Sequence, residues 1–394
     1  MTARRPTGEP RPLSGPFVLA AGGTGGHIFP AEALARELMA RGRTVTLVTD
    51  RRGGSFGDRM AGVPTHRIRA GRFDRGPLGK AVGLAELALG TIQAGWLLRR
   101  LRPAAVIGFG GYPSVPTVLA ASRLGVPTLI HEQNALLGRA NRLLARRASR
   151  IALGFAETAR LGPAEAARAS ATGNPVRPAV AALGGQIYLA PAPPGSIELL
   201  VTGGSQGARI FSEIVPAALA LLPAALRQRL RVSQQARPED LDRVRRRYAE
   251  LGLAVELAAF FADVPERLAR AQFVICRAGA STVAELAAIG RPALLVPYPH
   301  AADDHQSANA AALARAGAAW QMPQEAFTAD GLARFLDETL GAPDRLARAA
   351  AAARALARPE AARHLADLAL ALAGGGTRPG ENGPAAAAGR EAAA

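Results

Sequence analysis

Cysteine, lysine and long apolar runs are all scarce in this sequence. Its 394 residues include one cysteine, Cys276, which excludes an internal disulfide framework and fits a reducing compartment. The apolar stretch nearest the start, residues 17–21, is too short for the core of a signal peptide. No uninterrupted run approaches the ~20 apolar residues that a membrane-spanning helix needs. We therefore expect a cytoplasmic protein without a spanning helix.

Positive charge is concentrated in the first half of the chain. The net charge is +17, and nearly all of the basic residues are arginine. Residues 1–177 hold 26 Lys and Arg against 10 Asp and Glu, which leaves +16, whereas residues 178–394 hold 22 against 21. The excess positive charge of residues 1–177 is typical of a protein that binds a nucleic acid, an anionic membrane surface or a phosphate-rich substrate. Because we find no zinc-ligand spacing, RNA-binding aromatic signature or helix-turn-helix, we do not expect a nucleic-acid partner.

Strand and helix patterns alternate twice along the chain. Short apolar segments predict strands at 17–21, 44–49, 105–108, 127–131, 197–202, 229–233, 273–276 and 293–297. A helix is predicted at 30–41, and a stretch rich in proline and glycine at 190–196 separates the two halves. Apolar strands separated by helices indicate parallel sheets covered on both faces. The predicted fold is α/β, with two Rossmann-like domains facing across a cleft.

The predicted boundaries follow these patterns. Residues 16–177 form the first domain, and residues 178–355 form the second. Residues 356–373 form a final helix. Residues 1–15 are polar and are expected to be a flexible arm, and residues 374–394 have the composition of a disordered tail.

Each domain opens with a strand that runs into a glycine-rich turn. The segment at 18–26 is echoed by the segment at 199–207. Glycines let the backbone approach an anion closely, and the free amides at the start of the following helix point toward it. A dinucleotide-dependent oxidoreductase is the obvious rival, but Ile28 stands where the third glycine of its fingerprint belongs. The paired turns therefore favour phosphate binding over plain tight turns.

Seven motifs follow one another between residues 18 and 310. They are GGTGGHIFP at 22–30, GFGGYPS at 108–114, HEQN at 131–134, GNPVR at 173–177, GGSQGA at 203–208, CRAGASTVAE at 276–285, and PYPH at 297–300 leading to Gln306. In this order they resemble the motifs of the MurG family, the transferase that converts lipid I into lipid II. The resemblance implies a GT-B fold whose final helix crosses back to the first domain. It also implies an inverting N-acetylglucosaminyltransferase of peptidoglycan synthesis. The donor would be UDP-N-acetylglucosamine, and the acceptor would be the C4 hydroxyl of N-acetylmuramyl-(pentapeptide)-pyrophosphoryl-undecaprenol.

The resemblance places the donor mainly on the second domain. It assigns Ser205 and Gln206 to the diphosphate, Phe261 to the edge of the uracil, Ala280, Ser281 and Thr282 to a second helix start near the phosphates, Glu285 to the ribose hydroxyls, Gln306 and Asn134 to the sugar, and Arg177 to the nucleotide across the cleft. In the first glycine loop it counts Thr24, Gly25 and Gly26 among the substrate-binding residues. The alternative for Arg177 is a surface salt bridge.

Departure of UDP leaves negative charge that the protein must stabilise. The sequence has no Asp-x-Asp triplet, and the adjacent Asp303 and Asp304 fit a polar loop. We therefore expect neither a metal nor a cofactor, and we assign this role to helix N-termini and Arg177.

The acceptor hydroxyl needs a base that titrates near physiological pH. His27 has a suitable intrinsic pKa and lies on the loop expected to face the acceptor. It could equally bind the diphosphate of the acceptor or cap its helix. Glu132 is the second candidate base, with a structural carboxylate beneath the cleft as its alternative role. His131 and His300 are expected to pack at strand ends.

Two basic features suggest a membrane surface. Arg139, Arg142, Arg146 and Arg150 form one stripe if 138–150 is a helix, although such a stripe is commonly a solvated face. An apolar helix at 80–98 is followed by further arginines, and the alternative for it is a core helix. An apolar patch rimmed by cations can rest on an anionic leaflet, so we expect a peripheral protein on the cytoplasmic face of the bacterial inner membrane.

Other functions remain open at this stage. A transferase of the same fold could act on another lipid acceptor, and a UDP-N-acetylglucosamine 2-epimerase would need no lipid at all. A non-catalytic nucleotide-binding regulator would keep the donor motifs but have no use for the motifs at 108–114 and 131–134.

Overall fold

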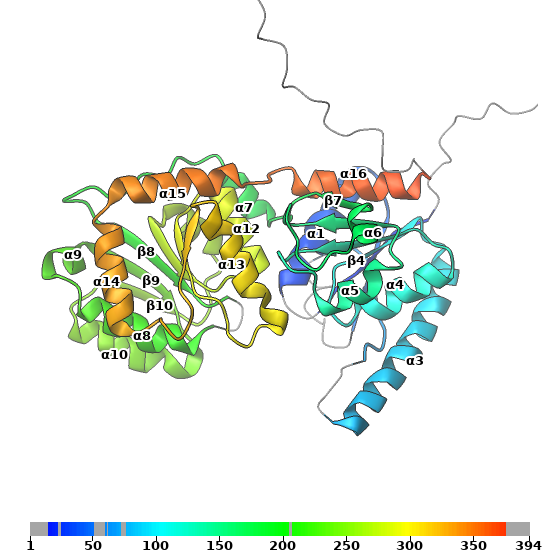
Figure 1. The fold of residues 1–394 in the computed structure, drawn as a ribbon, viewed down its shortest axis with the longest axis horizontal. Helices are drawn as coiled ribbons and strands as arrows, with labels where there is room; N and C mark the ends of the chain where they lie inside the picture. Colours follow the sequence, from blue (N-terminus) through cyan, green and yellow to red (C-terminus); the bar gives the residue numbers. More distant parts are fainter. Residues whose placement is uncertain are drawn as a thin grey trace, which may run out of the picture.

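A computed structural model describes residues 15–22, 25–50, 60, 62–71, 76–204 and 207–375. The arm predicted at 1–15 and the tail predicted at 374–394 fall almost entirely outside these residues, and so do Thr24, Ser205 and Gln206. The described chain forms two α/β domains side by side (Figure 1).

The first domain is built on a seven-stranded parallel sheet in the order β3-β2-β1-β4-β5-β6-β7. Its strands are β1 (Phe17–Ala20), β2 (Val45–Thr49), β3 (Thr65–Arg67), β4 (Ala105–Gly108), β5 (Thr128–Glu132), β6 (Arg150–Leu153) and β7 (Ala169–Ala171). Its helices are α1 (Gly25–Ala40), α3 (Pro77–Leu101), α4 (Ser114–Arg123), α5 (Arg139–Ala145) and α6 (Pro163–Ala166). Along β1, Phe17 and Leu19 enter one apolar core and Val18 enters the other. Burial on both faces explains why this strand reads as an unbroken apolar run.

The second domain is built on a six-stranded parallel sheet in the order β10-β9-β8-β11-β12-β13. Its strands are β8 (Ile197–Thr202), β9 (Leu230–Gln235), β10 (Val255–Ala258), β11 (Phe273–Cys276), β12 (Ala293–Leu295) and β13 (Ala319–Gln321). Its helices are α7 (Pro178–Leu183), α8 (Arg209–Ala220), α9 (Ala224–Arg229), α10 (Leu241–Glu250), α11 (Val264–Arg270), α12 (Ala280–Ile289), α13 (His305–Arg315), α14 (Ala329–Leu340) and α15 (Pro343–Ala355), with short 3₁₀ turns η1 (Pro238–Asp240) and η2 (Ala302–Asp304). Cys276 is fully buried in this core, where burial raises the pKa of its thiol to about 12.

The strand order changes direction at the same place in both sheets. β1 lies between β2 and β4, and β8 lies between β9 and β11. In open parallel sheets, ligands bind outside the carboxyl ends of the strands at such a switch point. The prediction of two Rossmann-like domains is confirmed, and the two glycine-rich turns follow β1 and β8 at these switch points.

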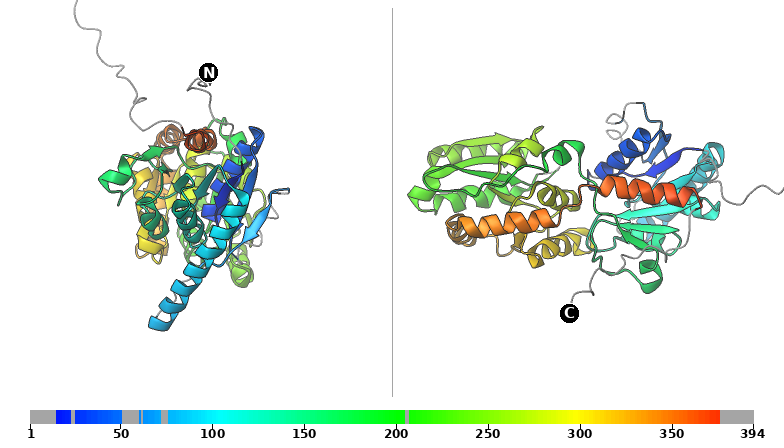
Figure 2. Two further views of the ribbon diagram at one scale, coloured as in Figure 1. Left: turned by 90° about the vertical axis from the view of Figure 1, so that its right-hand side faces the viewer. Right: turned by 90° about the horizontal axis from the view of Figure 1, so that it is seen from above.

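Helix α16 (Ala361–Ala373) packs on the first domain although it follows the second in sequence (Figure 2). Its Leu365, Ala366 and Ala369 are buried in the same apolar cluster as β1 and α1. The chain therefore crosses between the domains twice, once before α7 and once before α16. The boundaries at 177 and 355 stay predictions.

Two helix predictions differ from the structure. Helix α1 begins at Gly25 rather than at residue 30, with Pro30 inside it. The helix predicted at 138–150 ends at Ala145, and Arg150 begins β6. The four arginines at 139–150 therefore do not form one helical stripe, because the last of them belongs to a strand.

Helix α3 protrudes from the first domain (Figure 2). Gly83, Gly90, Ala94 and Leu98 are buried on its inner face. A Cβ atom on Gly90 would lie 2.0 Å from the carbonyl oxygen of Arg69, so glycine is needed where these backbones meet.

The outer face of α3 exposes large apolar side chains, namely Val82, Leu84, Leu89, Ile92 and Trp96. By length and composition alone, the segment Gly79–Leu101 could cross a membrane, and it is the one such helix in the described part of the chain. Lys80 and Glu86 interrupt this segment, so it does not contradict the expectation that no uninterrupted apolar run reaches the length of a spanning helix.

Candidate active site

The two glycine loops of the first domain meet at His27. A Cβ atom on Gly22 would lie 2.7 Å from Cγ of Pro113, so the loop after β1 touches the loop after β4. Gly110 and Gly111 have φ values of 80° and 71°, which glycine adopts without strain. Added Cβ atoms on them would lie 3.4 Å and 3.5 Å from the His27 ring. The imidazole of His27 therefore lies against this turn, on the first turns of α1.

The loop after β5 fixes His27 from its other side. Nδ1 of His27 lies 3.1 Å from Oε1 of Gln133, which is 1% exposed. The amide nitrogen of Gln133 lies 3.0 Å from the carbonyl oxygen of Phe109 and 3.1 Å from that of His131. Three strand ends thus contribute to the position of one imidazole.

Glu132 is buried, and both of its carboxylate oxygens are fully used. Oε1 accepts from the backbone N–H and from Nδ2 of Asn134, each at 3.0 Å. Oε2 accepts from the backbone N–H of Gly138 at 2.9 Å and from Nδ2 of Asn141 at 2.8 Å. Four donors on one carboxylate favour the structural role for Glu132, which shapes the loop at 133–141, over the role of base.

Asn309 on α13 joins the two domains beside this loop. It is fully buried, and its Oδ1 accepts from the backbone N–H of Ala135 at 2.8 Å. Its Nδ2 donates to Oδ1 of Asn134 at 3.1 Å and to the carbonyl oxygen of Ala278 at 3.0 Å. Asn134, assigned to the sugar, therefore sits between Glu132 and the second domain. Asn309 was not predicted from the sequence, because a single asparagine in the alanine-rich segment of α13 does not indicate a contact with another domain.

A cluster of arginines from the first domain surrounds Asp303 of the second. Nε and Nη2 of Arg139 lie 3.0–3.1 Å from the carboxylate, while Arg142 and Arg160 approach to 3.3 Å and 3.6 Å. The hydrogen bonds from Arg139 hold the pKa of the Asp303 carboxyl below its usual value. Asp303 thus links the domains, and two of the four arginines expected to form a stripe contact it.

The residues assigned to the donor include two helix N-termini of the second domain. Helices α8 and α12 follow the neighbouring strands β8 and β11, and neither has a side-chain cap among the residues that the structure describes. Ala280, Ser281 and Thr282 form the first turn of α12, where Oγ of Ser281 is buried with no hydrogen-bond partner among the described residues. Uncapped amides at a helix start leave donors for an anion.

Arg177 and Glu285 form a bidentate ion pair between the first crossover and α12. Nε of Arg177 lies 2.7 Å from Oε1, and Nη2 lies 2.9 Å from Oε2. The Arg177 guanidinium also lies 5.2 Å from the ring centre of Phe29 on α1. Two residues assigned to the nucleotide therefore pair with each other in this structure.

The remaining predicted residues lie elsewhere in the second domain, Gln306 in the first turn of α13 and Phe261 on a loop. Oε1 of Gln306 accepts from the backbone N–H groups of Ala278 and Tyr298, at 3.2 Å and 3.0 Å, and so ties two loops together. Phe261 is buried, and Cζ of the Arg267 guanidinium lies 4.0 Å from the centre of its ring. His300 is exposed and meets the ring of Tyr298 edge-on, so the expectation that it packs at a strand end is wrong.

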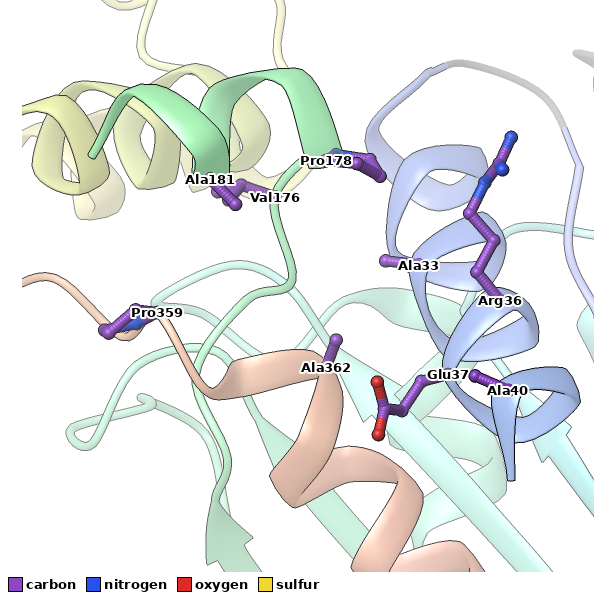
Figure 3. Close-up of a pocket in the computed structure, with 9 residues that line it drawn as sticks. All are labelled: Ala33, Arg36, Glu37, Ala40, Val176, Pro178, Ala181, Pro359 and Ala362. Carbon is purple, nitrogen blue, oxygen red and sulfur yellow. The ribbon is translucent and has the colours of Figure 1, made fainter. Parts of the chain in front are cut away.

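A cavity of about 300 Å³ lies between α1 and the two crossover segments (Figure 3). Alanine, proline and valine side chains make up most of its lining. Glu37 at its edge is paired with Arg41, which also binds Asp367 on α16. The cavity marks the junction where the domains join, away from the loops that carry His27.

The chain matches two family models. Residues 17–153 match the glycosyltransferase family 28 N-terminal domain, and residues 198–365 match the glycosyltransferase family 28 C-terminal domain. A protein of Rhodospirillum centenum is 60% identical over 91% of this chain and 95% of its own length, and a protein of Rhodospirillum rubrum is 57% identical over 91% and 92%. Both are described as UDP-N-acetylglucosamine–N-acetylmuramyl-(pentapeptide) pyrophosphoryl-undecaprenol N-acetylglucosamine transferase.

Solved structures show the same fold. MurG of Acinetobacter baumannii is 32% identical, with a TM-score of 0.75 over 91% of this chain and 99% of that one. A UDP-GlcNAc 2-epimerase from Neisseria meningitidis is 12% identical, with a TM-score of 0.63 over 90% and 99%. At that identity, the epimerase shows a shared fold alone.

Proposed function

This chain belongs to the MurG family of family 28 glycosyltransferases, and we propose that it transfers N-acetylglucosamine from UDP-N-acetylglucosamine to the C4 hydroxyl of N-acetylmuramyl-(pentapeptide)-pyrophosphoryl-undecaprenol. The reaction turns lipid I into lipid II in peptidoglycan synthesis. Two observations carry the site assignment. The loops after three strands of the first domain fix the imidazole of His27, and α8 and α12 of the second domain begin without a side-chain cap among the described residues.

The chemistry follows from these positions. Nε2 of His27 takes the proton of the C4 hydroxyl as its oxygen bonds to the anomeric carbon. The bond from that carbon to the diphosphate oxygen breaks on the opposite face, which inverts the configuration. The N-termini of α8 and α12, with Arg177, stabilise the charge on the departing UDP, so transfer should persist in EDTA.

The donor assignment predicts that Glu285→Ala weakens UDP-N-acetylglucosamine binding. A hydrogen bond to a charged group contributes about 1.5–3 kcal/mol, so loss of the ribose contacts should raise Kd about 10- to 100-fold. Isothermal titration calorimetry measures this directly. Glu157→Ala is the matched control, because Glu157 is 90% exposed and its ion pair with Arg315 is long, at 3.8 Å. An unchanged Kd in Glu285→Ala would remove Glu285 from the nucleotide site.

The acceptor lies in a membrane, and we propose that α3 docks the enzyme on an anionic leaflet. Its outer apolar face ends at the exposed Arg99 and Arg100. Apolar side chains can enter the headgroup region, while each near-surface cation adds about 1 kcal/mol on anionic lipid. The protein would be peripheral, because the inner face of α3 already packs on the first domain.

Replacing Ile92 and Trp96 together by serine should therefore reduce co-sedimentation with phosphatidylglycerol vesicles several-fold. The control is Ile187→Ser, an exposed apolar residue outside α3. Equal sedimentation of both variants, or binding to neutral vesicles as strong as to anionic ones, would count against docking through α3.

A further inference from the structure

A continuous chain of hydrogen bonds runs from a backbone carbonyl at the first crossover to His27. Nε2 of His131 lies 3.2 Å from the carbonyl oxygen of Gly173. Nδ1 of His131 lies 3.1 Å from Nε2 of Gln133, whose Oε1 lies 3.1 Å from Nδ1 of His27. His131 is fully buried and Gln133 is 1% exposed, so bulk water does not compete for these bonds.

The carbonyl oxygen of Gly173 determines which atom donates and which accepts in each of these hydrogen bonds. A carbonyl oxygen can only accept, so Nε2 of His131 must carry a hydrogen toward Gly173. Burial lowers the pKa of His131 to about 4, which keeps the ring neutral at physiological pH. A neutral imidazole has one N–H. Nδ1 of His131 therefore carries a lone pair and accepts a hydrogen bond from the side-chain NH₂ group of Gln133.

The Gln133 amide can take only one orientation. Its nitrogen faces Nδ1 of His131 and also the carbonyl oxygens of Phe109 and His131, all of which are acceptors. The reversed amide would bring its oxygen against these three acceptors in a buried site, which is strongly unfavourable. The Oε1 atom of Gln133 therefore faces His27, whose Nδ1 must supply the hydrogen.

We propose that Gln133 is a positioning residue that holds neutral His27 as the tautomer with its hydrogen on Nδ1, leaving the Nε2 lone pair for the acceptor hydroxyl. The proposal rests on the function proposed above, in which His27 is the base. As the hydroxyl O–H bond breaks and the Nε2–H bond forms, His27 becomes an imidazolium. Oε1 of Gln133 then stabilises the new positive charge through the same hydrogen bond.

The expected effect is on turnover rather than on donor binding. In the Ser-His-Asp triad, loss of the correct tautomer lowers kcat about 10⁴-fold when a carboxylate is the partner. A neutral amide holds the ring less firmly, so we expect Gln133→Leu to lower kcat about 10- to 100-fold. The KM for UDP-N-acetylglucosamine should stay unchanged, because Gln133 is not among the residues assigned to the donor. Gln228→Leu, on the exposed side of α9, is the matched control.

The decisive readout is the tautomer itself, measured by ¹⁵N NMR of the full chain labelled at histidine. The His27→Gln variant identifies the His27 signals. In the wild type at neutral pH we expect a hydrogen on Nδ1 and none on Nε2, and in Gln133→Leu a mixture of both forms. A hydrogen on Nε2 in the wild type would overturn the proposal without any need for the variant to fold. Full kcat in a folded Gln133→Leu would overturn it as well.

These outcomes separate the positioning proposal from the proposed function. If His27→Gln keeps its activity, His27 is not the base, whatever its tautomer. If His27→Gln is inactive but wild-type His27 carries its hydrogen on Nε2, only the role of Gln133 fails. A wild-type enzyme that transfers no sugar refutes the proposed function and leaves the tautomer measurement intact.

Discussion

His27→Gln should lower the kcat of sugar transfer by about 10²- to 10⁴-fold, the usual contribution of a general base. Glutamine is of similar size and can still donate to Gln133, so the packing against Gly110 and Gly111 is kept. It cannot take a proton from the acceptor hydroxyl. The KM for UDP-N-acetylglucosamine should not change, because His27 acts on the acceptor hydroxyl in the proposed reaction and is not among the residues assigned to the donor.

Steady-state kinetics with both substrates varied also tests the other roles of His27. If His27 binds the acceptor diphosphate, the variant raises the KM for the acceptor and leaves kcat nearly unchanged. If it only caps or packs α1, the variant loses stability to urea but keeps both constants. His364→Gln is a matched control on α16, away from the glycine loops. Only a fall in kcat supports the role of base.

Glu132→Leu should be among the most destabilising single substitutions in the first domain. Leucine leaves four donors, from Asn134, Gly138 and Asn141, without their carboxylate in a buried site. Each unsatisfied buried group costs about 1–3 kcal/mol, and partial relaxation reduces the sum, so we expect a loss of about 3 kcal/mol or more in the free energy of unfolding. Urea unfolding measures this loss.

The isosteric variant Glu132→Gln distinguishes a structural carboxylate from a base. Its NH₂ group would face N–H donors on one side of the loop, so a structural role predicts lower stability and, through Asn134, weaker binding of the donor. A base predicts a stable protein that binds both substrates and has almost no kcat. Glu157→Gln, exposed in the same domain, controls for loss of charge. Stability equal to wild type would contradict the structural role.

The central strands could be predicted from the sequence, and the edge strands could not. β1, β4, β8 and β11 are buried on both faces, so they read as apolar runs, and three of the four were placed to the residue. β3 and β7 lie at the edges of the first sheet, where each is only three residues long, partly exposed, and made of polar or small side chains that leave no such signal. The early start of α1 was missed because Pro30 looked like a helix beginning.

The motifs pointed to His27, Glu132, Arg177 and Glu285, but not to how these residues pair. The Arg177–Glu285 pair and the contact of Asn134 with Asn309 each join residues more than 100 positions apart. Such contacts depend on how the two domains are placed, which no local pattern encodes. The exposed face of α3 is a similar case, since composition shows an apolar helix but not which side of it packs.

The most direct test is transfer of radiolabelled N-acetylglucosamine from UDP to a short-chain lipid I analogue in the presence of EDTA. We expect a labelled disaccharide-lipid with a β-1,4 link at a rate unaffected by EDTA, and a rate at least about 10²-fold lower with His27→Gln. Binding of UDP-N-acetylglucosamine without any labelled lipid would contradict the assigned acceptor. Release of free UDP together with an epimerised sugar would instead show a 2-epimerase.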